Sequence, residues 1–148
     1  MRKLAGSGLL LMMVAGLAAC EDSNAVFVDH LAIVNINPSH GAVGIGYETD
    51  VTVTFSDVLN PSTLSAASMC LTTDTAPPPD PANPCGTGTP VAGTVTYDAA
   101  TFSARVVPSQ ALVPGERYTL HLTPAIEGSE SGGLPAIVRA SFTTFPTN

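Results

Sequence analysis

Hydrophobic and polar residues alternate along several short stretches of this chain. The clearest alternation lies in 50–57, DVTVTFSD, where Val51, Val53 and Phe55 fall on one side of an extended backbone and two threonines fall on the other. A period of two is typical of a strand that buries one face. No stretch beyond residue 20 sustains hydrophobic residues at the spacing of an amphipathic helix. The pattern therefore predicts an all-β fold.

Further strands are predicted wherever this alternation recurs between turns rich in proline and glycine. A single helical turn is expected in 60–65, NPSTLS, because Pro61 suits the first position of a helix. Together these segments predict an Ig-like antiparallel β-sandwich of about seven strands in one domain, 31–148. One further strand is predicted in 67–73. In each of the other predicted strands, alternate residues are expected to face the core: Ala32, Val34 and Ile36 in 30–38, Val95 and Tyr97 in 91–98, Phe102, Ala104 and Val106 in 101–108, Tyr118, Leu120 and Leu122 in 112–124, and Val138, Ala140 and Phe142 in 136–144.

The first twenty residues follow a different pattern. Arg2 and Lys3 precede a hydrophobic run, 4–19, that ends at Cys20. A basic start, a short hydrophobic segment and small residues before a cleavage site form a secretory signal peptide, 1–19. The run is shorter than the roughly 20 residues of a membrane-spanning helix. These features predict export, either by an ordinary cleaved signal or with a modification at the cysteine.

The sequence LAAC at 17–20 resembles the lipobox of bacterial lipoproteins. The resemblance implies cleavage before Cys20, a diacylglycerol thioether on its sulfur, and a further acyl chain such as palmitate on the new amino group. Residues 20–30 would then form a tether between the membrane and the domain. Because Glu21 and Asp22 follow the cysteine, and acids there retain some lipoproteins at the inner membrane, the choice of membrane stays open, with the outer membrane favoured.

Removal of the signal peptide changes the charge of the chain. The remaining chain has no lysine, and its three arginines, Arg105, Arg117 and Arg139, face twelve acidic residues, which gives a net charge of −9. Such a surface repels phosphate backbones and anionic headgroups. Nucleic acid is therefore excluded as a partner, and contact with a membrane is expected through the lipid alone.

Two cysteines, Cys70 and Cys85, remain once Cys20 is acylated. An exported chain meets an oxidising environment, so a disulfide is favoured. It would stabilise the fold by ~3 kcal/mol through loop closure. A metal pair or two free thiols are the alternatives, but the metal pair lacks the short Cys-x-x-Cys spacing and a nearby histidine.

Residues 74–90, DTAPPPDPANPCGTGTP, carry six of the 13 prolines. They predict an extended, polyproline-like loop that Cys85 ties back to Cys70. Such a loop could serve as an arm that contacts a partner, or as an insertion that tolerates solvent, and the second interpretation is favoured.

Several motifs in order resemble the bacterial Ig-like domains of the S-layer type: NPSHGAVGI at 37–45, VTVTFSD at 51–57, LVPGERYTLHLTP at 112–124 and SFTT at 141–144. The resemblance spans roughly 31–145. It implies a spacer or adhesive module of cell-envelope proteins, without catalytic residues, and a tyrosine corner at Tyr118. The chain departs from the family at 127–133, EGSESGG, where an Asp and a Gly often stand.

The opening HLAIVNINPSHGA, 30–42, also resembles periplasmic copper-resistance proteins. In those proteins the histidine is the first residue, whereas His30 lies ten residues beyond Cys20, and 127–133 supplies no histidine. No metal site is therefore expected; the alternative is copper or calcium held by His30, His40, His121 or loop acids such as Asp57, Asp98 and Glu116. His121 is expected to face solvent because it alternates with Leu120 and Leu122, His40 to lie in an exposed turn, and His30 to end the tether.

Catalytic motifs are absent from the sequence: there is no Gly-x-Ser-x-Gly elbow, no His-Glu-x-x-His and no phosphate-binding loop. We therefore expect a non-enzymatic, exported envelope protein that needs no cofactor. Its predicted role is a structural or binding module that contacts an envelope protein or a polysaccharide, with periplasmic metal binding as the alternative.

Overall fold

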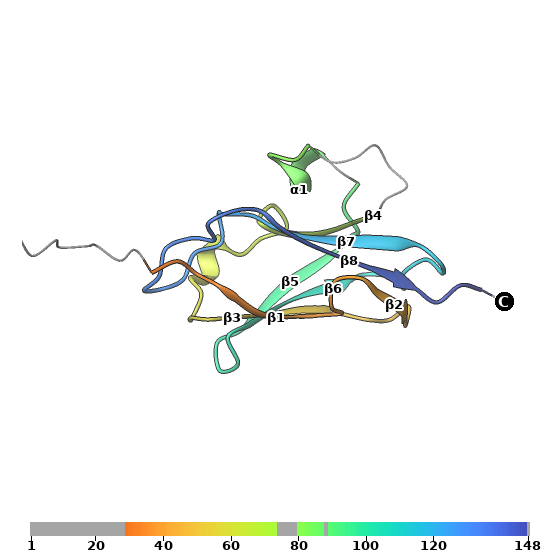
Figure 1. The fold of residues 1–148 in the computed structure, drawn as a ribbon, viewed down its shortest axis with the longest axis horizontal. Helices are drawn as coiled ribbons and strands as arrows, with labels where there is room; N and C mark the ends of the chain where they lie inside the picture. The colour runs from red at the N-terminus through yellow and green to blue at the C-terminus, as the bar shows by residue number, and fades with distance from the viewer. Residues whose placement is uncertain (1–28, 74–79, 88, 148) are drawn as a thin grey trace, which may run out of the picture.

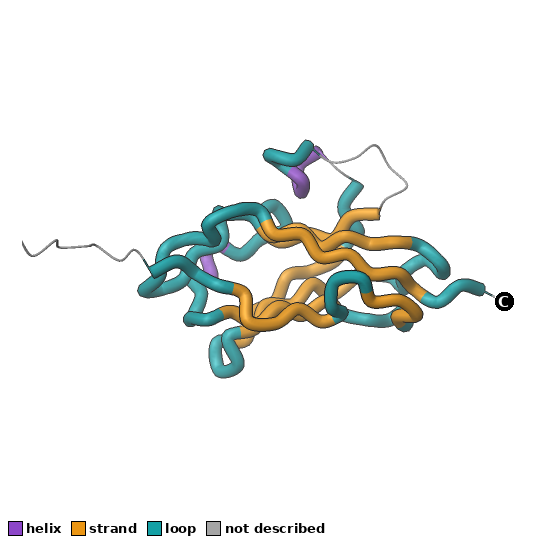
Figure 2. Tube along the Cα trace, viewed as in Figure 1, coloured by secondary structure: helices purple, strands orange, loops and turns teal. Residues whose placement is uncertain are grey.

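Two four-stranded sheets, packed face to face, make up the part of the chain that the computed structural model describes, residues 29–73, 80–87 and 89–147 (Figure 1, Figure 2). The strand order is β1-β3-β6-β5 in the first sheet and β2-β8-β7-β4 in the second. Neighbouring strands are antiparallel except β2 and β8, which are parallel. The elements are β1 (Ile33–Asn37), β2 (Ala42–Ile45), β3 (Val51–Phe55), the 3₁₀ turn η1 (Pro61–Thr63), β4 (Met69–Thr73), α1 (Pro84–Thr87), β5 (Gly93–Asp98), β6 (Ser103–Pro108), β7 (Arg117–Leu122) and β8 (Val138–Thr144).

This arrangement confirms the predicted Ig-like β-sandwich. The first sheet follows the A-B-E-D order of Ig strands, and β8, β7 and β4 take the places of G, F and C. Eight strands form instead of about seven, because the corner after β1 contributes β2 to the second sheet. The helical turn predicted after Asn60 is present as η1. No helix among the described residues is long and apolar enough to cross a membrane.

The hydrophobic core lies between the sheets, as the alternation predicts. Val51, Val53 and Phe55 of β3 are buried, and the threonines between them are not. Val95, Tyr97 and Val138 are half-buried and pack against the core. The other predicted inward residues that are buried are Ala104, Val106, Tyr118, Leu120, Leu122, Ala140 and Phe142.

The prediction for β1 is wrong for Ala32 and Val34, which are exposed; the exposed fraction of Val34 is 66%. The register between β1 and β3 shifts between Ile33 and Asn35. Such a bulge reverses the alternation, so Leu31 and Ile33 face the core before it and Ile36 packs against the core after it.

Phe102 was also expected to face inward, but its exposed fraction is 40%. It lies in the turn that joins β5 and β6, with a left-handed backbone (φ 52°), so it does not continue the alternation of β6. Its carbonyl accepts a hydrogen bond from the N–H of Phe55, at 2.9 Å. The turn is thus longer than the sequence predicts, and β6 begins two residues later, at Ser103.

The predicted tyrosine corner is present. The Tyr118 hydroxyl accepts a hydrogen bond from the backbone N–H of Val113, at 2.7 Å. Its buried ring stacks on Phe142, with ring centroids 5.8 Å apart. Gly115 supplies the left-handed turn before β7 (φ 69°), and its N–H donates to the carbonyl of Phe145, at 2.8 Å. These contacts fix the loop before β7 to the end of β8.

The corner makes a measurable contribution to stability. Tyr118→Phe keeps the ring but leaves the N–H of Val113 without its acceptor, so we expect the free energy of unfolding to fall by about 1–2 kcal/mol. Urea denaturation followed by circular dichroism measures this change. Tyr47→Phe is the matched control, since the Tyr47 hydroxyl makes no hydrogen bond to the described residues. Equal losses in the two variants would contradict this role for the corner.

Candidate functional site

A cavity of about 460 Å³ lies at the end of the sandwich where residues 29–32 join the domain. Residues 29–32, the end of β3 and the loop between β7 and β8 contribute its walls. The N–H of Gly132 donates to the carbonyl of Asp29, at 3.0 Å, and His30 pairs with Gly132 as a parallel bridge. His30, expected to end the tether, is therefore attached to the domain. The lining residues are Asp29, His30, Ala32, Ser56, Asp57, Glu130 and Ser131.

Asp57 holds the loop that closes this cavity. Its Oδ2 atom accepts hydrogen bonds from the Ser131 hydroxyl (2.9 Å), the Ser131 N–H (3.1 Å) and the Glu130 N–H (3.3 Å). Its Oδ1 atom accepts one from the N–H of Val58, at 2.6 Å. Led by the Ser131 hydroxyl, these donors lower the pKa of Asp57 below its ordinary value of 3.8. The carboxylate is therefore an ionised clamp between β3 and the 128–133 loop.

The three histidines occupy separate places in the fold. His30 lines the cavity, and Nδ1 of the exposed His40 accepts a hydrogen bond from the N–H of Ser141, at 3.2 Å. His121 was expected to face solvent, and this prediction is wrong, because its exposed fraction is 2%. Its Nε2 atom lies 2.9 Å from the Thr72 hydroxyl. Within the described ranges, no three His, Cys, Asp or Glu residues are grouped so that they could hold a metal ion.

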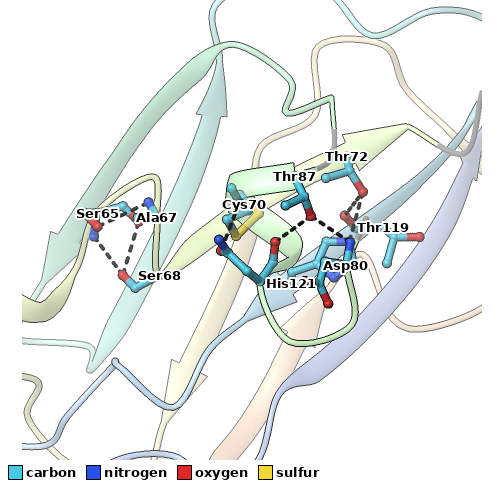
Figure 3. Close-up of a disulfide and its surroundings, with 12 residues drawn as sticks. Ser65, Ala67, Ser68, Cys70, Thr72, Asp80, Thr87, Thr119 and His121 are labelled. Atoms are coloured by element: carbon cyan, nitrogen blue, oxygen red, sulfur yellow. Dashed lines mark hydrogen bonds between the residues drawn. A yellow bond between two sulfur atoms is a disulfide. The ribbon is translucent and has the colours of Figure 1, made fainter. Parts of the chain in front are cut away.

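The segment 80–87, here called the strap, explains the burial of His121. The predicted disulfide is present: Cys85 in α1 is bonded to Cys70 in β4, with a Cα–Cα distance of 5.7 Å. The Arg139 guanidinium donates to the carbonyl of Pro81, at 2.9 Å, and attaches the strap to β8. Because Cys70 is the cross-strand partner of His121, the pinned strap lies over the imidazole (Figure 3).

Part of the prediction for the proline-rich loop is corrected by the strap. Residues Pro84–Thr87 form the short helix α1 instead of an extended polyproline-like chain. The Thr87 hydroxyl, which donates to the carbonyl of Asn83 and accepts from the N–H of Asp80, closes this turn. Residues 74–79 and 88 lie outside the described residues, as does Cys20, the predicted lipidation site.

The outer face of the first sheet differs from the strapped face, since none of the described residues covers it (Figure 1). Most of its side chains are polar, and Val34 of β1 and Val107 of β6 are apolar exceptions. Thr52, Arg105 and Thr96 lie side by side across three strands, and the Thr54 hydroxyl lies 3.1 Å from that of Ser103 in the next row. Arg105 forms an exposed ion pair with Asp50, at 3.4 Å. One face of the sandwich is therefore closed by the strap, and the other is open.

Three structural roles were not predicted from the sequence: the clamp formed by Asp57, the contact of Thr72 with His121, and the attachment of the strap by Arg139. Cross-strand register could have drawn attention to His121, because it lies directly opposite Cys70. The partners of Asp57 in the 128–133 loop, Glu130 and Ser131, however, lie more than seventy residues further along the chain, where no short-range pattern connects them.

The clamp predicts a specific pH dependence. Because folding lowers the pKa of Asp57, its contribution is fully present above about pH 5 and is lost as the pH falls through the folded pKa. We therefore expect Asp57→Asn to have a lower Tm than the unmodified protein at pH 7 and a similar Tm near pH 2. Thermal unfolding between these values tests this, with Asp98→Asn, at the exposed end of β5, as control. A Tm difference that does not change with pH would contradict the clamp.

Comparison with known proteins agrees with this geometry. The family model described as "Bacterial Ig-like domain" matches residues 28–144. No curated protein sequence matches the chain. Among solved structures, the N-terminal part of the bacterial S-layer protein SbsC is similar, with a TM-score of 0.52 and 17% identity over 78% of this chain, which spans 24% of the SbsC chain.

Two copper-resistance proteins have similar structures. CopC from Methylosinus trichosporium OB3b has a TM-score of 0.57 and 17% identity, over 80% of this chain and 97% of CopC. PcoC from Escherichia coli has a TM-score of 0.55 and 17% identity, over 76% of this chain and 98% of PcoC. At such identities the likeness shows the fold alone. The match to the family model covers most of the sequence, and this chain belongs to the bacterial Ig-like domain family.

Proposed function

We propose that this protein is a non-enzymatic lipoprotein of the bacterial cell envelope, a structural or binding module that contacts an envelope protein or a polysaccharide. The observation that carries the proposal is the asymmetry of the sandwich. The disulfide-pinned strap closes the outer face of β4 and β7, whereas the outer face of β1-β3-β6-β5 is open. A rigid polar sheet of this kind provides a preformed surface for recognition at small cost in conformational entropy.

The chemistry of the open face is consistent with polar ligands. Hydroxyl groups of threonine and serine can both donate and accept hydrogen bonds. Arg105 is the only cation on the described strands of that sheet, and Asp50 is its ion-pair partner. The anchor at Cys20 would hold this surface at the membrane and raise its effective concentration for partners in the envelope. The similarity to SbsC supports an envelope role without naming the partner.

A second candidate function is metal binding, and the similarity to CopC and PcoC favours it. In this chain His30 shares the cavity with Glu130, and the two would supply an imidazole and a carboxylate to copper, whereas only the carboxylate of Glu130 suits calcium. The Asp57 carboxylate in the same cavity already accepts several hydrogen bonds. Retention of added Cu²⁺ or Ca²⁺ in native mass spectrometry would favour this second function over the first.

Photo-crosslinking in living cells tests the proposed role. Lysine-directed reagents cannot be used, because no lysine remains after the predicted cleavage. A photo-reactive residue at Thr52, on the open face, should capture an envelope protein, or a polysaccharide that retards the protein on a gel. The same residue at Ala82, which is exposed on the strap, is the matched control and should capture less.

The anchor is tested in the same cells with Cys20→Ala. Labelled palmitate should enter the unmodified protein and not this variant, and the capture from Thr52 should fall with the loss of the anchor. Equal capture from Thr52 and Ala82 would contradict the assignment of the open face. Palmitate in both proteins would contradict the anchor.

A further inference from the structure

The strand β5 has a free edge, and this edge differs from the others in the sandwich. An unpaired strand edge exposes a row of N–H and C=O groups and readily pairs with another strand. Proteins usually protect such edges with bulges, prolines, lysines, very short strands or a covering segment. The two sheets described here have four edges, formed by β1, β5, β2 and β4.

Three of these edges are protected. The bulge after Ile33 interrupts β1. The strand β2 has four residues, with a shifted register and a left-handed Gly44 (φ 70°). The edge of β4 is covered, because the N–H of Val91 donates to the carbonyl of Leu71, at 2.7 Å, and Thr72 pairs with Pro90.

The edge of β5 has none of these protections. Its six residues, GTVTYD, pair with β6 in a continuous register without a bulge, and they include neither proline nor lysine. No backbone hydrogen bond among the described residues reaches its free side. Its one charged residue, Asp98, stands at the end of the strand.

The hydrogen-bond pattern shows which groups are available. The N–H of Ser109 donates to the carbonyl of Ala92, at 2.8 Å, so Ala92 points toward β6. Because the direction alternates along an antiparallel strand, Thr94 and Thr96 also point toward β6. Gly93, Val95 and Tyr97 therefore present their N–H and C=O groups to the free edge.

We propose that β5 pairs antiparallel with β5 of a second copy of this chain, about a two-fold axis at Val95, so that two first sheets join into one. In this register Val95 faces Val95, and Gly93 of each copy faces Tyr97 of the other. All three outward-pointing residues then donate and accept hydrogen bonds across the axis. An axis midway between two residues would set outward-pointing groups against inward-pointing ones, and an axis at Thr94 or Thr96 would pair only two of the three outward-pointing residues within the strand.

The side chains fit this register. A Cβ atom at Gly93 would collide with the carbonyl oxygen of Val107, so glycine is required here, and its lack of a side chain leaves a gap at the edge. The ring of Tyr97, fixed by a hydrogen bond from the N–H of Leu59 to its hydroxyl (2.8 Å), would cover that gap from the other copy. On the outer face Thr94 lies opposite Thr96, and Asp98 lies opposite Ala92. No acidic side chains oppose one another along the edge, although the chain as a whole is strongly acidic.

The association is tested with the full chain, purified from expressing cells in mild detergent and measured by analytical ultracentrifugation. We expect a reversible dimer. Val95→Pro removes an N–H that points away from β6, so it spares the internal ladder but should weaken dimerisation at least about tenfold. Val95→Ala loses side-chain contacts but keeps the N–H, and it should still dimerise. A monomer at all concentrations for the unmodified protein, or equal dimerisation of both variants, would overturn the proposal.

Cysteine pairs test the register independently of stability. Thr94 and Thr96 of opposite copies would form a non-hydrogen-bonded pair with Cα atoms about 4.5 Å apart, within reach of a disulfide. Two copies of Thr94, or two of Thr96, would lie about 7–8 Å apart on the diagonal, beyond that reach. We therefore expect Thr94→Cys and Thr96→Cys chains with different tags to crosslink when co-expressed, and each alone to remain uncrosslinked.

Mass spectrometry of the linked peptides distinguishes these bonds from any through Cys20. Crosslinks of one variant with itself at the same yield, or no crosslink between the two variants, would overturn the proposed pairing. A crosslink from Thr94→Cys to a different envelope protein, without a self-crosslink, would assign the edge to that protein and would also overturn it.

Discussion

Burial of the inward side chains of the central strands is the interaction on which the rest of this structure depends. Val53 of β3, Leu120 of β7 and Phe142 of β8 lie between the sheets and are nearly inaccessible to water. Full burial of such a side chain stabilises a fold by about 1.5–3 kcal/mol. The peripheral contacts attach loops to this core: Tyr118 holds the loop before β7, and Asp57 holds the loop after it. Their positions are therefore set by where the core places the strand ends.

The strap gives the sandwich two unlike outer faces. In β4 the residues 69–72 are buried on both faces, because the core covers one face and the strap covers the other. A polar pair, His121 and Thr72, is consequently enclosed beneath a disulfide. The first sheet has no such cover within the described chain, and its outer side chains and the edge of β5 remain accessible. Both proposals use this accessible half of the molecule.

The parts of this fold that depend on local sequence could be predicted. Alternation located β3, β6, β7 and β8, and the Leu-x-Pro-Gly-x-x-Tyr motif located the corner at Tyr118. Alternation failed where the backbone departs from regular pairing. The bulge after Ile33 exposes Val34, and the left-handed turn exposes Phe102. Neither departure has a glycine or proline at the residue itself to indicate it.

The candidate site was less predictable, because its contacts join distant segments. His121 has the sequence pattern of a solvent-facing residue, and only the strap above it makes it buried. Asp57 and Ser131 are separated by 74 residues, yet they form one clamp. The disulfide could be predicted because compartment and cysteine count are properties of the sequence. The surface that Cys85 would cover could not be predicted.

The central claim of this account is that the disulfide holds the strap over one face of a sandwich that is otherwise open. Labelling of histidines with diethyl pyrocarbonate, read by mass spectrometry, tests it most directly in the folded protein. His121 should be protected and His40, which is exposed, should react. In Cys70→Ala/Cys85→Ala, with a β-sheet circular dichroism spectrum retained, labelling of His121 should rise several-fold while that of His40 stays constant. Reaction of His121 in the unmodified protein, or its full protection in the variant, would contradict the account.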